Sequence, residues 1–216
     1  RFEEGLSRFE HKDDVTVEYR SFQLDPHAAR EPERDLYDVL AAKFGISREQ
    51  AVQMNQRVAE QGREVGIDFR FGVVIPSNTL DAHRLIKFAG RHGKEQDVIE
   101  RLFEAYFTSG RNVADHRTLA DIAEQAGLDR KAAEEMLKSG AHADEVEADG
   151  IEASRLGARG VPFFVINRKY GVSGAQPDSV FLDVLQQAWQ DEHPLIMTES
   201  DASGEVCEDG TCKPDK

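Results

Sequence analysis

The sequence predicts an α/β or α+β protein whose sheet is interrupted by an inserted helical block. Residues 15–22 alternate between apolar and polar side chains, which is typical of a half-buried strand. A strand pattern returns only at residues 162–173, and helical patterns fill most of the chain between. The chain of 216 residues is long enough to bury a core without disulfides or metal ions to stabilise it.

The N-terminal residues predict a helix followed by the first of these strands. Residues 1–10 are expected to be helical because Phe2, Leu6 and Phe9 recur on one stripe. In the strand segment the apolar residues occupy every second position: Val15, Val17 and Tyr19.

The middle of the chain predicts a continuous series of helices separated by loops that contain glycine. Ser47 with Gln50 three positions later resembles a capping box, and Asn78 is a candidate N-cap. Residues 68–71 are expected to be extended. The helices are predicted at 35–44, 47–66, 78 onward, 95–107, 118–127, 129–138 and 143–159.

The C-terminal part predicts a hairpin, a last helix and a polar tail. The hairpin joins residues 162–166 to residues 170–173, and Pro177 opens a helix with an apolar stripe. Residues 191–216 hold eight acidic residues and two lysines, so they carry −6 of the net charge of −14. We expect residues 193–216 to form a flexible acidic tail.

The overall charge argues against two classes of partner. With 27 basic and 41 acidic residues, the chain lacks the basic surface that nucleic acid requires, and anionic membranes are disfavoured. No apolar run approaches the ~18 residues of a membrane-spanning helix. We therefore expect neither a nucleic-acid nor a membrane partner.

Both cysteines, Cys207 and Cys212, lie in the last ten residues. A core free of cysteine predicts a reducing compartment, the cytoplasm. The pair is either a redox couple or two solvated thiols in the tail, and the sequence leaves both open. We expect no metal site, because two thiolates make half a zinc site and His193, the nearest histidine, lies 14 residues upstream of Cys207.

Several segments together resemble the DsbA family, and its cytoplasmic FrnE-like branch most closely. The resemblance covers about residues 1–190 and implies a thioredoxin-like fold with an inserted all-helical block. It implies a thioredoxin-like core of residues 1–30 and 158–192 around a helical insertion of residues 31–157. The matching segments are Gly160–Ile166, Tyr170–Gln176, Arg1–Glu4, Phe22–Pro26, Asn78–Thr79 and Ala82–Arg84.

The resemblance also implies a substrate site. In the family, the segment around Val161 and Pro162 carries a cis-proline, and the residue before it pairs with an extended substrate peptide. The family's C-x-x-C motif is absent from the given sequence, so we expect it upstream of Arg1, together with a central strand. Cys207 and Cys212 are then a candidate second redox pair. His83, in the Ala82–Arg84 segment, is expected to have a packing role.

The function implied is a thiol–disulfide oxidoreductase or disulfide isomerase that acts on protein or peptide disulfides. It needs no bound cofactor, with glutathione as a candidate redox partner, and it is a monomer or a dimer. Two alternatives stay open. One is a glutathione-dependent isomerase similar to the 2-hydroxychromene-2-carboxylate isomerases, which place a serine where DsbA proteins have the first cysteine. The other is a non-catalytic peptide-binding module.

Overall fold

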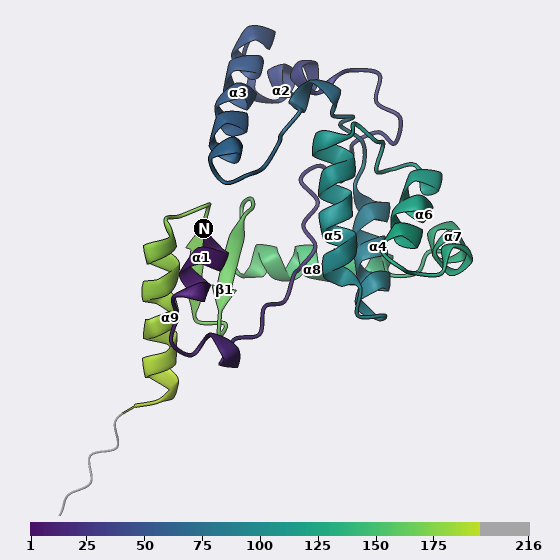
Figure 1. The fold of residues 1–216 in the computed structure, drawn as a ribbon. Coiled ribbons are helices and arrows are strands. Elements are labelled where there is room, and N and C mark those ends of the chain that lie inside the picture. The colour runs from purple at the N-terminus through teal and green to yellow at the C-terminus, as the bar shows by residue number, and fades with distance from the viewer. Residues whose placement is uncertain (195–216) are drawn as a thin grey trace, which may run out of the picture. The chain divides into compact units, whose positions relative to one another are not determined.

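The computed structural model describes residues 1–194, and their packing divides the chain into two units (Figure 1). The first unit combines Arg1–Thr16 with the chain from Pro162 onward, and the second is the continuous stretch Val17–Val161. The domain bounds expected from the sequence, 1–30 with 158–192 around 31–157, stay a prediction. Packing contacts alone do not test which part of a chain folds independently.

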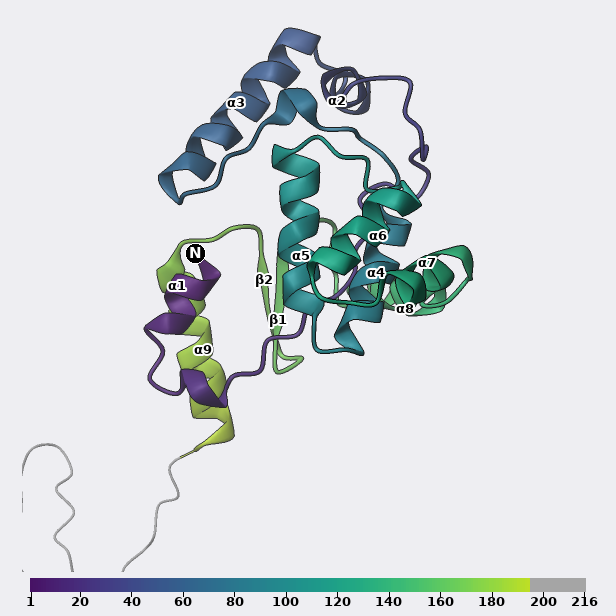
Figure 2. The same cartoon turned by 45° about the vertical axis from the view of Figure 1, so that its right-hand side comes forward.

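The first unit is built on a β-hairpin and two helices from opposite ends of the described chain. Its elements are α1 (Phe2–Ser7), the 3₁₀ turn η1 (Lys12–Asp14), β1 (Phe163–Ile166), β2 (Tyr170–Ser173) and α9 (Asp178–Glu192). Helix α1 lies directly against α9 in both views (Figures 1 and 2). Gly5 allows this close approach, because a Cβ there would lie 2.6 Å from the carbonyl oxygen of Asp178.

Aromatic rings form the core of this unit. The ring of Phe2 lies 5.2 Å from that of Phe164 and 5.6 Å from that of Phe181, measured between centroids. Phe181 is 2% exposed, and Phe9 packs edge-on against Trp189. The apolar stripes predicted for the first and last helices therefore both face this core.

The hairpin is confirmed with a three-residue turn. Phe163 lies opposite Ser173, and Ile166 lies opposite Tyr170. The turn residues Asn167 and Arg168 have positive φ values of 50° and 54°, which lets the chain reverse direction between the two strands.

The second unit is the predicted helical block. Its 3₁₀ turn is η2 (Phe71–Val73), and α5 continues into the π-helical turn η3 (Glu104–Thr108). The main buried cluster includes Leu85 and Leu119, which have no exposed surface. The helices are α2 (Leu36–Phe44), α3 (Arg48–Glu64), α4 (Leu80–Gly90), α5 (Glu95–Phe103), α6 (His116–Gln125), α7 (Arg130–Lys138) and α8 (Ala143–Arg155).

Some local predictions hold, and others need correction. Ser47 and Gln50 form both hydrogen bonds of the capping box. The residue before α4 is Thr79 rather than Asn78, although Asn78 Oδ1 still accepts the N–H of Leu80 at 2.9 Å. Helix α8 ends at Arg155 rather than 159.

The strand predicted over residues 15–22 is wrong for the described structure. The segment is extended, but it pairs with no strand among residues 1–194, whose one sheet consists of β1 and β2. An alternating sequence pattern gives a segment one apolar face, but a β-strand also needs a neighbouring strand for its backbone hydrogen bonds. Here a side chain holds the segment instead, because the N–H of Ser21 donates to a carboxylate oxygen of Asp149 at 2.7 Å.

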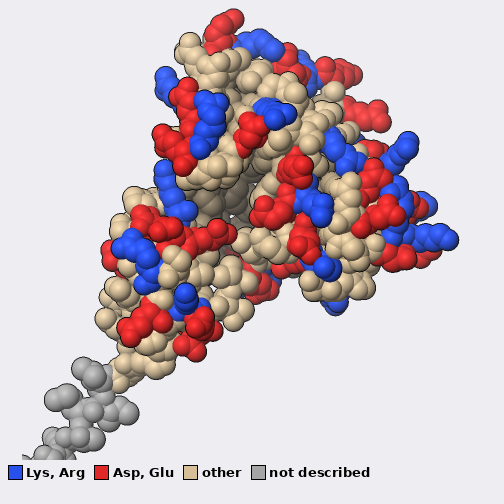
Figure 3. All heavy atoms as spheres, in the orientation of Figure 1, with Lys and Arg blue, Asp and Glu red and all other residues tan. Residues whose placement is uncertain are grey.

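Acidic and basic side chains are intermixed over the face drawn in Figure 3, and no large area of one sign gathers there. Many charged side chains of residues 1–194 form ion pairs, such as Arg48 with Asp35 and Arg130 with Asp121. No helix within residues 1–194 is long and apolar enough to cross a membrane.

Candidate functional site

The predicted substrate segment leads directly into β1. Val161 is 50% exposed, and Pro162 is also exposed. The carbonyl oxygen of Pro162 accepts a hydrogen bond from the N–H of Gly174 at 2.9 Å, which extends the hairpin pairing by one residue beyond each strand. The position of Pro162 is thus fixed by β2.

The opposite edge of β1 is open among the described residues. In an antiparallel pair, hydrogen-bonded and non-hydrogen-bonded positions alternate. The carbonyl oxygen of Pro162 accepts the N–H of Gly174, so Phe164 and Ile166 are also hydrogen-bonded positions that face β2. Phe163 lies between Pro162 and Phe164, and its N–H and C=O point away from β2. Val161 lies two residues before β1, in a bend of the chain. No described residue hydrogen-bonds to the backbone of Val161.

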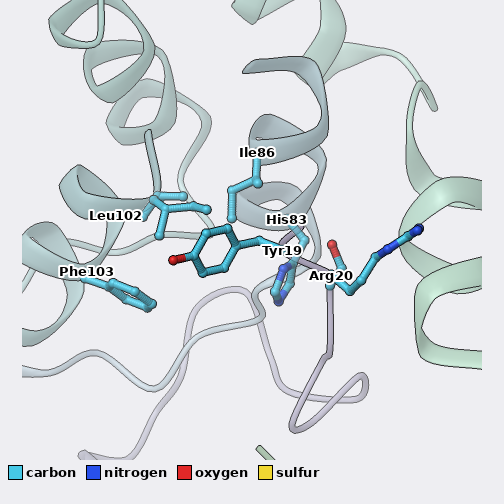
Figure 4. Close-up of a pocket in the computed structure, with 8 residues that line it drawn as sticks. Tyr19, Arg20, His83, Ile86, Leu102 and Phe103 are labelled. Carbon is cyan, nitrogen blue, oxygen red and sulfur yellow. The ribbon is translucent and has the colours of Figure 1, made fainter. Parts of the chain in front are cut away.

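A separate cavity of about 140 Å³ lies inside the second unit (Figure 4). We call it the His83 cavity. One wall is the extended segment of residues 19–21, and the others come from α4 and α5. Its lining residues are Tyr19, Arg20, Ser21, His83, Ile86, Ile99, Leu102 and Phe103.

The side chain of His83 is partly buried, and its imidazole makes no hydrogen bond to a described residue. Burial and, to a smaller extent, the positive charge of nearby Lys87 outweigh the opposing effect of Asp149 and lower the pKa of His83 to about 4. The side chain is therefore neutral at pH 7. The predicted packing role for His83 describes only part of its position, because the imidazole also forms part of the cavity wall.

Asp149 on α8 anchors one wall of the His83 cavity. It is 5% exposed, and its carboxylate lies 2.5 Å from Lys87 Nζ and 3.1 Å from Arg20 Nη1. Burial raises the pKa of this carboxyl, but hydrogen bonds from Lys87, the Ser21 N–H and Arg20 outweigh that effect and leave the pKa below its ordinary value. The charged form thus ties residues 20–21 to α4 and α8.

Asp81 and Arg84 form a second buried ion pair at the start of α4. Arg84 Nη1 lies 2.6 Å from Asp81 Oδ1, and Asp81 Oδ2 also contacts Arg30 and His116. Burial raises the pKa of Asp81, but the hydrogen bonds from His116, Arg84 and Arg30 bring it below its ordinary value.

The same guanidinium group of Arg84 also closes the C-terminal end of α7. It donates to four carbonyl oxygens in the last turn of α7 and in the residues that follow it. The four acceptors are Met136, Leu137, Ser139 and Ala141.

Comparison with known proteins places this architecture in a family. The family model described as a DSBA-like thioredoxin domain matches residues 1–186. The chain belongs to the DSBA-like thioredoxin domain family. The thioredoxin-like fold with a helical insertion, expected from the resemblance, is thereby confirmed, and the FrnE-like branch stays a prediction.

Two relatives of this DSBA-like domain differ in how much is known about them. The crystal structure of a probable DsbA oxidoreductase from Streptomyces coelicolor is 38% identical in sequence, with a TM-score of 0.83. That match covers 100% of this chain and 91% of the other. YwbO, an uncharacterized protein of Bacillus subtilis (strain 168), is 24% identical over 182 residues, 83% of each chain.

The structure accounts for some of the predicted site residues of this DSBA-like domain. Val161 and Pro162 lie together at the entry to β1, as neighbours in sequence must. The predicted catalytic pair, Cys207 and Cys212, lies outside the described residues, as does most of the predicted tail.

Sequence reasoning missed the two buried carboxylates and the His83 cavity. One signal was available, because Asp81 and Arg84 are opposite charges three positions apart, next to the apolar residue Leu85. Asp149 likewise follows the buried residue Val146 by three positions on α8. An acid on an apolar helical stripe indicates a buried partner.

Proposed function

We propose that the protein exchanges thiols and disulfides in protein or peptide substrates. Its membership of the DSBA-like family supports this proposal, as does the relative described as a probable DsbA oxidoreductase. The single observation that carries it is the open backbone edge at Val161, in front of β1. That edge offers an extended substrate one N–H donor and one C=O acceptor.

The proposed reaction is a two-step exchange. A thiolate attacks one sulfur of the substrate disulfide, so that a mixed disulfide forms and the substrate's second sulfur leaves as a thiolate. A second protein thiolate then attacks the mixed disulfide and releases the first substrate sulfur. The substrate gains two electrons and two protons, and the protein dithiol becomes a disulfide.

We assign the attacking dithiol to the C-x-x-C motif expected upstream of Arg1, where a helix N-terminus lowers a thiol pKa. Cys207 and Cys212 are the proposed second couple. Their acidic neighbours, among them Glu208 and Asp209, disfavour a thiolate, which suits a relay pair better than an attacking one. Glutathione in the cytoplasm is the proposed redox partner.

Thiol counting tests where the attacking dithiol lies. The purified full-length protein is alkylated under denaturing, reducing conditions and its intact mass is measured. A chain heavier than 24.2 kDa with two or more extra alkylations supports the proposal. Two alkylations in total contradict the dithiol mechanism. A heavier chain without an extra thiol favours the glutathione-dependent isomerase, which has a serine in place of the first cysteine.

Replacing Pro162 with Ala is expected to lower kcat/KM for reduction of a disulfide peptide by about tenfold. Alanine releases the fixed φ of proline and adds an N–H at the edge where substrate would dock. Pro177→Ala, at the start of α9, is the matched control and should leave kcat/KM near the wild-type value. Equal rates for both variants would remove Val161 and Pro162 from the proposed docking site.

Replacing both tail cysteines with serine is expected to slow turnover several-fold when glutathione supplies the electrons, because the second couple is lost. The direct attack on substrate should continue, so a single-turnover reaction started from the reduced protein serves as the control. Unchanged turnover and an unchanged redox state of the remaining thiols would leave Cys207 and Cys212 as solvated thiols.

A further inference from the structure

The floor of the His83 cavity is apolar and its mouth is aromatic. Ile99 and Leu102 are buried at 7% and 6% exposure, whereas Tyr19 and Phe103 are 42% and 55% exposed. Figure 4 shows the Tyr19 ring lying between Leu102 and Phe103 on one side and His83 on the other. A buried apolar floor below two partly exposed rings is suited to a flat, apolar ligand.

The volume of the cavity sets the size of such a ligand. At about 140 Å³, it is close to the ~150 Å³ engineered apolar cavity that binds benzene. One six-membered ring fits within this volume.

His83 adds one polar requirement. A neutral imidazole has one donor nitrogen and one acceptor nitrogen, so a ligand in the cavity can form a hydrogen bond with it. The guanidinium of Arg20 already donates to Glu18 and Asp149, so the cavity offers no unpaired charge from that residue. A neutral hydroxyl group would satisfy the imidazole without requiring a counter-charge.

We propose that the helical unit binds a small phenol-class molecule, one aromatic ring with one hydroxyl group, in the His83 cavity. The ring contacts Ile99 and Leu102, and the hydroxyl hydrogen-bonds to His83. This binding is distinct from the proposed exchange reaction, because it involves neither a cysteine nor the Val161 edge.

A titration of the full-length protein with phenol tests the site directly. Methyl NMR signals of Ile86, Ile99 and Leu102 are expected to shift saturably, with a Kd on the order of 1 mM or tighter. The methyl group of Ile151, exposed on α8, is the internal control and should not shift. The absence of saturable shifts at the three cavity residues overturns the proposal.

Toluene, which matches phenol in shape but lacks the hydroxyl, isolates the role of His83. His83→Leu is expected to lower the preference for phenol over toluene by roughly 2–10-fold, the value of one neutral hydrogen bond. His27→Leu, at an exposed position outside the cavity, should leave the preference unchanged. An unchanged preference in His83→Leu overturns the assignment of the hydroxyl to His83.

Filling the cavity supplies an independent test. Ile86→Phe is expected to weaken phenol binding at least tenfold, whereas Ile151→Phe makes the same change on the surface and should not. Should Ile86→Phe fail to fold, the wild-type methyl titration still decides. Tighter binding of N-acetyltyrosinamide than of phenol would assign the cavity to a polypeptide side chain and overturn the small-molecule proposal.

Discussion

Replacing Arg84 with Met is expected to lower the free energy of unfolding by about 3–5 kcal/mol. Arg84 is 5% exposed, and its loss leaves the carboxylate of Asp81 buried with less compensating charge. It also removes the donor shared by the carbonyl oxygens at the end of α7. Methionine keeps most of the aliphatic volume, so lost packing contributes little.

Arg91→Met is the matched control for this measurement. Arg91 follows the last residue of α4 and pairs with Glu145 at 3.0 Å, but its side chain is 66% exposed. Exposed ion pairs contribute little, so we expect a loss below about 1 kcal/mol. Urea unfolding at pH 7 measures the free energy of unfolding of both variants. Similar losses in the two would contradict the prediction that the buried Arg84 pair stabilises the protein more than the exposed Arg91 pair does.

The protein is expected to lose stability on acidification through His83. The folded protein holds this side chain neutral down to pH about 4, whereas the unfolded chain takes up the proton below about 6.5. Between these values the unfolded state binds more protons, so the free energy of unfolding falls as the pH falls. The loss specific to His83 amounts to roughly 3 kcal/mol at most between pH 7 and pH 4.

His83→Leu isolates this contribution. The stability of the variant relative to the wild type should improve steadily as the pH is lowered from 6.5 to 4, because leucine takes up no proton. Asp81 and Asp149, which also titrate in acid, are present in both proteins, and His27→Leu supplies a control with an exposed histidine. Parallel stability curves for the wild type and His83→Leu would contradict the prediction.

Local sequence signals predicted most of the helices, because each depends on residues close together in the chain. The apolar stripe of the last helix does bury Phe181 and Leu185, and the capping box at Ser47 forms. The strand predicted over 15–22 shows the limit of such signals. The sequence alternates there, yet Val17 and Tyr19 are each 42% exposed, because a strand also depends on which distant segment lies beside it.

The sequence likewise predicted one part of the candidate site and missed another. Val161 and Pro162 could be found because their role depends on adjacent residues at the start of one strand. The His83 cavity could not, because it joins residues 19–21 to α4 and α5, and Asp149 holds that wall from α8. No periodicity along the chain encodes contacts between residues more than a hundred positions apart.

The packing of α1 against α9 has a consequence for biosynthesis. The first helix emerges from the ribosome early, yet its partner begins only at Asp178. At 5–20 residues per second, translation leaves Phe2 and the rest of α1 without that partner for roughly 10–35 s. The helical unit is one continuous stretch that ends at Val161, so all of its residues are synthesised before α9, and we expect the hairpin unit to be completed last.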